Sequence, residues 1–331
     1  MTPRPLLALV LVFAAMVYNE AYGQDEAQFK AAMYELADRA SPVMRDVRKE
    51  LLNGMTDEQR DVLAPIPVRV VPNAGAGAMA LQIGSDRPSI VVTAGLVDAI
   101  DTFATIMAFS EAQQNYGCAI AYFNAYSNMF AHNYKIAYGY KAGPLRGIAE
   151  PFQFSRDSPE CEEVDRASFS GSQADQVREF YIAGSLAQIL GHEYGHHLYP
   201  INKRATSSER RRNELKADQF AMELISKAYG NPLAALPTVY WLAASDGFRL
   251  EDSESTHPAG MRRALILIDA ALDKLENDQE FVEYLRTSEK KNLAPKLGCI
   301  TAAFEGIRDI VRSEDGIDRK SLEQMRLECD S

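Results

Sequence analysis

The apolar positions of the chain repeat mostly with the three-to-four-residue spacing of amphipathic helices. Residues 25–50 carry this spacing, and Pro42 is placed to interrupt or kink the helix. Thr56, followed three residues later by Gln59, has the capping-box pattern that opens a second, short helix. We therefore expect an N-terminal helical segment over residues 24–64.

Strand-forming runs are confined to one stretch, where they predict strands at residues 68–71, 78–83 and 89–93. Turn-forming Pro, Asn, Gly and Asp residues separate the runs. The chain beyond them carries helical spacing. The pattern therefore predicts an α+β fold that is mostly helical, with a small three-stranded sheet.

A mainly aromatic stripe recurs every four positions, close to the spacing of one helical face. We interpret it as core packing against another helix rather than as the lining of a substrate groove. Residues 143–172, rich in Pro, Gly, Ser and acids, are expected to form an ordered loop or flap. The stripe comprises Cys118, Tyr122, Tyr126, Phe130, Tyr134 and Tyr138.

The candidate chemistry lies in residues 192–196, which form an H-E-x-x-H motif. A capping pattern at Ser172 and the apolar spacing beyond it place the motif on a helix. Histidines four residues apart share one helical face, with Cβ atoms about 5–6 Å apart, within reach of one tetrahedral ion. Glu193 is rotated by about 100°, so its carboxylate can reach a water at the metal without binding the metal. Two unrelated surface histidines are the disfavoured alternative.

A third ligand is predicted on the next helix, residues 208–230. Glu214 and Asp218 are four residues apart on this helix and share a face. A carboxylate ligand, followed one turn later by a carboxylate that accepts the N–H of a ligand histidine, is a sound metal-site design. Ala217 is small and allows the two helices to approach closely, whereas His197 faces elsewhere and is interpreted either as a support for a ligand or as structural.

These motifs resemble those of the gluzincin zinc metallopeptidases, which include the CAAX prenyl proteases, the HtpX heat-shock protease and periplasmic proteases such as BepA. The resemblance covers roughly residues 65–275, within which residues 102–172 look like an insertion. The matching segments are the strands with residues 90–96, the motif helix at 188–196, residues 214–218, and His257-Pro258 with Arg263.

The resemblance implies a zincin-type fold and agrees with the residue chemistry. One zinc ion per chain would be held by His192, His196 and Glu214. Glu193 would act as the general base, and Asp218 would orient a ligand histidine.

Two downstream residues gain a role from the same resemblance. His257 would stabilise the oxyanion, the alternative being a helix-entry residue before Pro258. Arg263 is expected to support the site by pairing with a carboxylate. The strand at residues 78–83 would be the edge to which an extended peptide adds. Ala80 stands where zinc aminopeptidases carry a glutamate that binds the substrate amino terminus, so an endopeptidase is favoured.

The composition and the N-terminal sequence indicate which partners and which cellular compartment to expect. A net charge of −11 argues against a nucleic-acid partner. Residues 1–23 have the layout of a secretory signal peptide, with Arg4 ahead of an apolar run at residues 6–17 and cleavage before Gln24. A membrane anchor is disfavoured because the run is too short to span about 30 Å. We expect an exported protein, periplasmic or secreted, whose mature chain has no transmembrane segment.

Export makes disulfides the expected state of the four cysteines. Four cysteines allow three pairings, and four buried free thiols are the weaker alternative. We favour Cys118–Cys161 and Cys299–Cys329, because each of these pairs would join a local segment.

The sequence thus predicts a metallopeptidase domain at residues 65–275, in which the insertion at 102–172 could form a lid, followed by a charged helical tail at 276–331. The predicted activity is zinc-dependent hydrolysis of peptide bonds in extended or misfolded proteins outside the cytoplasm. The expected partners are polypeptides. A chaperone-like polypeptide-binding protein with a latent or lid-covered metal site is the alternative.

Overall fold

The computed structural model describes residues 26–73, 76–83, 87–113, 115–137, 147–201, 205–229 and 232–245, together with residues 263, 267 and 269. In chain order its elements are α2 (Glu26–Gly54), α3 (Asp57–Leu63), β1 (Val68–Val71), β2 (Ala78–Ile83), β3 (Arg87–Thr93), α4 (Ala94–Gln113), α5 (Tyr116–Ala137), α6 (Pro151–Asp157), α7 (Arg166–Phe169), α8 (Gln173–Leu198), α9 (Ser207–Tyr229), η1 (Pro232–Ala235) and α10 (Leu236–Ser245).

The described part of the chain is mostly helical with one three-stranded sheet, which confirms the predicted α+β class. The sheet has the order β1-β3-β2, with β1 parallel and β2 antiparallel to β3. The predicted strand bounds are confirmed, except that β3 begins two residues earlier, at Arg87. α2 packs against β1, whereas β2 forms the other edge of the sheet, next to α8.

The N-terminal helices follow their predicted pattern with one difference. α2 continues through Pro42, so the helix is not interrupted there, and the alternative expectation of a kink stays a prediction. Pro42 removes the donor to the carbonyl of Asp38, and both residues lie on the exposed side, where water can take the place of that bond. The capping box at the start of α3 is confirmed, because Thr56 and Gln59 each accept a hydrogen bond from the backbone N–H of the other.

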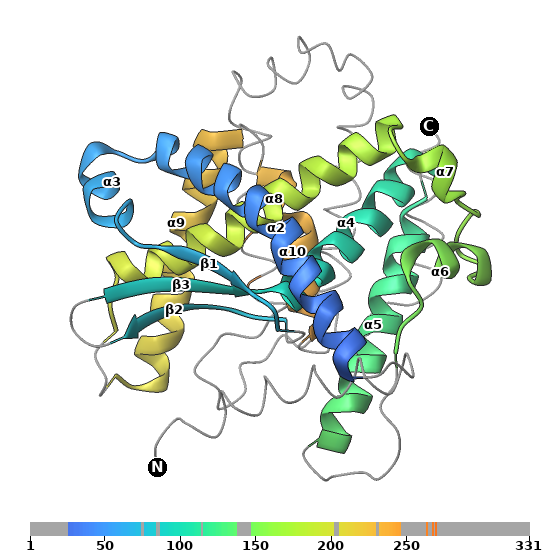
Figure 1. The fold of residues 1–331 in the computed structure, drawn as a ribbon, viewed down its shortest axis with the longest axis horizontal. Coiled ribbons are helices and arrows are strands. Elements are labelled where there is room, and N and C mark those ends of the chain that lie inside the picture. The colour runs from blue at the N-terminus through green and yellow to red at the C-terminus, as the bar shows by residue number, and fades with distance from the viewer. Residues whose placement is uncertain are drawn as a thin grey trace.

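α8 is the central helix of the molecule. It packs against α2, α4, α9, α10 and η1, and its last turns also contact β2 and β3. In Figure 1 the sheet, α3 and α9 lie at the C-terminal end of α8, and α5, α6 and α7 lie toward its N-terminal end. One continuous core joins these parts, and α2 contributes to it, so residues 26–54 belong to the same packed body as the motif helix. Core residues of α2 and α8 include Met44, Val47, Leu51, Leu186 and Leu190.

The N-terminal end of α8 is surrounded by aromatic packing and a disulfide. Tyr122 is fully buried and packs edge-on against Phe103, so the aromatic stripe forms core packing here, as expected. The predicted Cys118–Cys161 disulfide is present and joins α5 to the loop after α6. The described part of residues 102–172 is thus built into this end of the molecule. The lid hypothesis for this segment stays a prediction.

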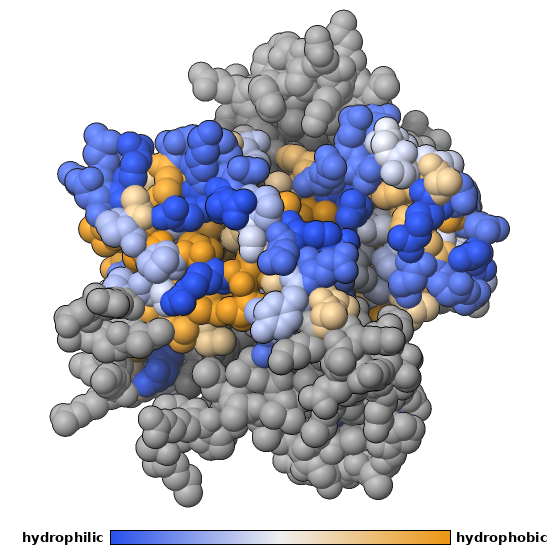
Figure 2. Space-filling view, in the orientation of Figure 1, coloured by the Kyte–Doolittle hydropathy of each residue, from blue (hydrophilic) through white to orange (hydrophobic). Residues whose placement is uncertain are grey.

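The surface differs between the sheet and the helices. Figure 2 shows apolar residues gathered over the strands, whereas the surfaces of α3, α6 and α7 are mainly hydrophilic. Half-buried strand residues in this region include Val71, Met79, Leu81 and Val91. Within the described residues, no helix has both the length and the apolar character needed to cross a membrane. The predicted signal peptide at residues 1–23, His257, Cys299, Cys329 and the tail at 276–331 lie outside the described residues.

Candidate metal centre

The H-E-x-x-H motif occupies the last turns of α8. The helix starts where the Ser172 hydroxyl accepts the backbone N–H of Asp175, and Gly171, with φ of +72°, makes the preceding turn. Local signals therefore set the start of the helix, and its regular period then places both motif histidines on one face. His192, Glu193 and Tyr194 are 9%, 6% and 0% exposed, so the motif is buried rather than a surface feature.

α8 and α9 approach each other closely enough to bring Glu214, the candidate ligand on α9, to the two histidines of α8. A Cβ atom placed on Gly195 would lie 2.7 Å from Cα of Ala217, and one on Gly191 would lie 3.0 Å from Cα of Ala221. These small residues let the two backbones touch, which confirms the expected role of Ala217. Glu214 of α9 is thereby carried to the histidines of α8.

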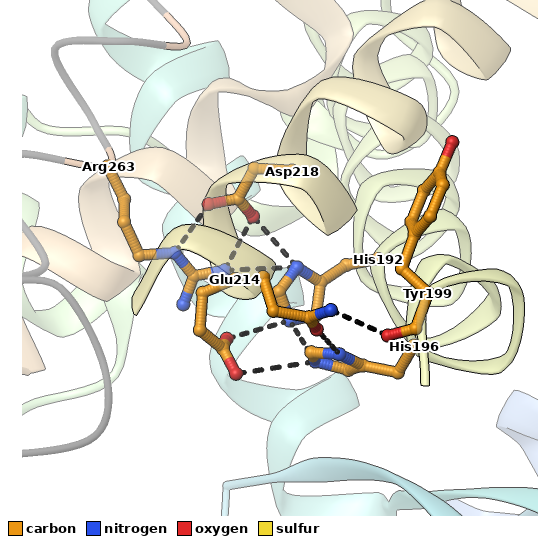
Figure 3. Close-up of polar contacts among 7 residues, drawn as sticks. His192, His196, Tyr199, Glu214, Asp218 and Arg263 are labelled. Carbon is orange, nitrogen blue, oxygen red and sulfur yellow. Dashed lines mark hydrogen bonds and ion pairs between the residues drawn. The ribbon is translucent and has the colours of Figure 1, made fainter. Parts of the chain in front are cut away.

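The three predicted ligands converge on one point (Figure 3). The Nε2 atoms of His192 and His196 are 3.0 Å apart. Glu214 places one carboxylate oxygen 3.3 Å from Nε2 of His192 and the other 3.5 Å from Nε2 of His196. Around a tetrahedral ion with bonds of about 2.0–2.1 Å, neighbouring ligand atoms lie about 3.3 Å apart. The three side chains therefore fit a divalent cation.

The charge around this point also fits a divalent cation. Glu193, Glu214 and Asp218 are buried carboxylates, and Arg263 forms an ion pair with Asp218. With both histidines neutral, this set carries a net charge of −2. Buried charge is costly unless it is paired, so a bound dication would stabilise the arrangement.

Asp218 orients His192, as predicted. Its Oδ1 atom lies 2.8 Å from Nδ1 of His192. This contact directs Nε2 of His192 to the point where the three candidate ligands converge. Burial favours the neutral acid, but Arg263 and His192 outweigh it and lower the pKa of Asp218 to about 2. Burial also disfavours the charged form of His192, yet Asp218 outweighs burial and raises the pKa of His192 to about 9. A metal ion would displace the proton of His192, because the ligand must be neutral.

Arg263 pairs with a carboxylate, as expected from the sequence. Its Nε and Nη2 atoms donate to the two oxygens of Asp218 at 2.7 Å and 2.6 Å. A bidentate pair of this kind fixes the carboxylate in one orientation. Arg263 thus holds Asp218, and Asp218 in turn holds His192 (Figure 3).

Asn213 completes the site and was missed in the sequence. Its Oδ1 atom lies 3.2 Å from Nδ1 of His196, so it fixes the second histidine ligand as Asp218 fixes the first. Its Nδ2 atom donates to the backbone oxygen of Tyr199 at 2.6 Å, which joins the end of α8 to α9. Burial, followed by the nearby His192, lowers the pKa of His196 and favours the neutral form that a ligand requires. An amide directly before the candidate ligand Glu214 is the signal that could have identified it.

Glu193 contacts the edge strand β2 and lies close to His192 and Glu214. Burial raises the pKa of Glu193, and a hydrogen bond from the backbone of Ala80 in β2 acts in the opposite direction. The backbone N–H of Thr93 in β3 donates to the carbonyl oxygen of Gly77. In an antiparallel pair, this bond determines which residues of β2 direct their N–H and C=O groups toward β3 and which direct them away. The N–H and C=O groups of Ala78, Ala80 and Gln82 therefore point away from β3, toward the edge of the described sheet.

The other candidates take separate positions. His197 is directed to the backbone of Ser89 in β3, away from the three ligands, which fits its structural interpretation. His257 lies outside the described residues, so its predicted role stays a prediction.

Comparisons with protein-family models, curated proteins and solved structures give no match for this chain. The case for its function therefore rests on the geometry of the site.

Proposed function

We propose that this chain is a zinc-dependent endopeptidase of zincin type that cleaves extended or misfolded polypeptides. One observation carries the proposal. Two histidine nitrogens and a glutamate carboxylate meet at 3.0–3.5 Å from one another, and the buried Glu193 stands beside them against an edge strand. This is the arrangement that the resemblance to the gluzincin peptidases implies.

The residues divide the chemistry among them. His192, His196 and Glu214 would hold the ion, which when bound supplies a Lewis acid that activates water and polarises a carbonyl. Glu193 would accept a proton from the attacking water and pass it to the leaving amine. Its buried position raises its pKa and so makes it a better base. Asp218 would keep the ligand His192 in one orientation.

β2 is the proposed binding site for the substrate main chain. An extended peptide that adds to this edge would bond the outward main-chain groups of Ala78 and Gln82 and the carbonyl oxygen of Ala80, whose N–H donates to Glu193. Such binding recognises the main chain of the substrate, so it favours unfolded segments over folded ones. The half-buried apolar residues over the strands favour the same class of substrate.

Two parts of the proposal extend beyond the described residues. His257 would stabilise the oxyanion from the segment that precedes Arg263. Residues 1–23 would direct export, and the Cys118–Cys161 disulfide supports this because disulfides persist in oxidising compartments.

The test is cleavage of an unfolded protein by the wild type and by Glu193→Gln, with bound zinc measured in both. We expect one zinc per chain in both proteins, and a loss of activity of at least a hundredfold in the variant. Glu179→Gln, an exposed acid on the same helix, is the matched control and should retain full activity. Cleavage that survives Glu193→Gln at full rate, or a chain that lacks stoichiometric zinc after refolding in defined zinc, would contradict the proposal.

The second candidate function is a polypeptide-binding protein with a latent metal site, favoured by the apolar surface over the strands. It predicts that wild type and Glu193→Gln suppress client aggregation equally and that neither cleaves the client. A chelator separates the two functions further. Zinc removal abolishes hydrolysis if the chain is a peptidase, and leaves aggregation suppression intact if it is only a binding protein.

A further inference from the structure

One buried side chain within the motif has no part in the metal chemistry. Tyr194 is fully buried, and its place between the two ligand histidines in sequence turns it to the opposite side of α8. A buried hydroxyl needs a hydrogen-bond partner. Nε of Arg48, from the N-terminal helix α2, donates to the Tyr194 hydroxyl oxygen at 3.1 Å.

The same guanidinium also binds the segment that leads into the sheet. Nη2 of Arg48 donates to the carbonyl oxygens of Ala64 and Ile66, just before β1 begins at Val68. One half-buried side chain therefore joins α2, the H-E-x-x-H turn of α8 and the entry to β1. A planar guanidinium, with five N–H donors in a fixed fork, can serve three acceptors at once, whereas a lysine offers one ammonium group.

The sheet carries this connection to the substrate side of the site. β1 pairs with β3 from Val68 to Val71, and β3 pairs with β2 along its whole length. The alignment of β1 against α8 therefore helps to set where β2 stands relative to Glu193, together with the direct contacts of α8 with β2 and β3. The candidate metal ligands do not share this dependence, because α8 and α9 are joined by the contact of Gly195 with Ala217 and by the hydrogen bond between His192 and Asp218.

We infer that Arg48 is a positioning residue for the reaction. It fixes the position of the motif turn relative to the sheet. A peptide on β2 would then place its carbonyl group beside Glu193 and the three candidate metal ligands. This inference rests on the proposed peptidase function. It separates two properties of the site: metal binding, which belongs to α8 and α9, and substrate alignment, which belongs to α8 and the sheet through Arg48.

The experiment compares Arg48→Met, Arg48→Lys and Tyr194→Phe with Arg45→Met, an exposed arginine on the same helix. The readouts are zinc content and the kcat and KM for an internally quenched peptide. A displacement of about 1 Å at a reacting centre costs up to about a hundredfold in rate. We expect kcat to fall about tenfold to a hundredfold in Arg48→Met, with KM within about twofold and zinc still stoichiometric.

The companion variants make the inference falsifiable. Tyr194→Phe keeps the ring and should lower kcat in the same direction, and its loss should not add to that of Arg48→Met. Arg48→Lys should recover part of the rate, and Arg45→Met should match the wild type. Equal kcat in Arg48→Met and Arg45→Met overturns the inference, even if the melting temperature falls. A parallel loss of zinc overturns it too, because Arg48 would then act on the ligands.

Hydrogen exchange keeps this inference distinct from the proposed function. If the wild type shows no Glu193-dependent cleavage, the proposed function fails, and the alignment is judged by amide exchange alone. In Arg48→Met we expect faster exchange in residues 78–83 and 190–197, and unchanged exchange in residues 214–225. Unchanged exchange in β2 and in the motif turn overturns the inference, whatever the enzyme does.

Discussion

The two ends of α8 are built by different physical means. Its C-terminal turns carry buried charge, hydrogen-bonded histidines and a helix contact made by glycine and alanine. Its N-terminal end is surrounded by the edge-on rings of Phe109, Phe152 and Phe169 and by the Cys118–Cys161 disulfide. The first arrangement fixes a few atoms in relation to one another, and the second holds the fold together. We therefore expect damage at one end to change metal binding and damage at the other to change stability alone.

The largest effect is expected from Asp218→Ala. The change leaves the guanidinium of Arg263 buried without its carboxylate, at a cost of about 3–5 kcal/mol in the free energy of unfolding. It also frees the ligand His192, which should lower metal affinity by about 10–100-fold. Urea denaturation and a metal-competition titration measure the two losses. The exposed acid Glu223, changed to Ala on the same helix, is the control and should alter neither quantity.

The disulfide should affect stability alone. It closes a sequence separation of 43 residues, for which the chain-entropy estimate is about 4 kcal/mol. We expect the double variant Cys118→Ser, Cys161→Ser to lose up to this amount of unfolding free energy, with metal affinity within about twofold of the wild type. A fall in metal affinity in the folded double variant would show that the two ends are coupled through α8.

Two glycines of α8 allow the effects of overpacking at two places in the same helix to be compared. A Cβ on Gly184 would lie 2.1 Å from Cβ of Ala234, and one on Gly195 would lie 2.7 Å from Cα of Ala217. Overpacking of this kind costs about 1–3 kcal/mol, so both Gly→Ala variants should unfold at lower urea concentrations. Only Gly195→Ala should also weaken metal binding, because it pushes α9 away from α8 beside the ligands. Gly54→Ala, whose nearest neighbour would be 3.4 Å away, serves as the control.

The smallest effect is expected from Asn213→Ala. It removes the partner of Nδ1 in His196 but leaves no buried charge unpaired, so metal affinity should fall only about tenfold. The free energy of unfolding should change by about 1 kcal/mol. Titration with a competing chelator measures the affinity, and Arg212→Ala, an exposed neighbour, controls for changes in α9 itself. A loss as large as that of Asp218→Ala would mean that the two histidines depend equally on their partners.

The sequence predicted those parts of the molecule whose signals are local. The capping residues of α3 and α8 and the alternation in the strands depend on neighbours a few residues away, so their bounds were nearly correct. His192, His196 and Glu214 followed from helical spacing together with chemistry. The Cys118–Cys161 pair was favoured only because its members are close in sequence, and the structure contains it.

What the sequence did not predict depends on contacts between elements. The bonds of Arg48 cross from α2 to α8, a sequence separation of 146 residues, and no spacing rule announces them. Asn213 reaches His196 only because α9 returns along α8. Pro42 has the residue type of a helix breaker, and only its exposed position shows that α2 can tolerate it. Each of these depends on which side of an element faces a neighbour, and that is settled by packing.

The donor set of the candidate site, two imidazoles and one carboxylate, has a practical consequence for the choice of metal. A site of two imidazoles and one carboxylate follows the general affinity order of divalent ions, in which copper and nickel compete strongly with zinc. The ion found in a purified sample would then depend on the metals to which the protein has been exposed, including nickel from an affinity resin. The metal used in the cell would be set by supply in the compartment where the chain folds, so metal analysis should follow refolding in defined zinc.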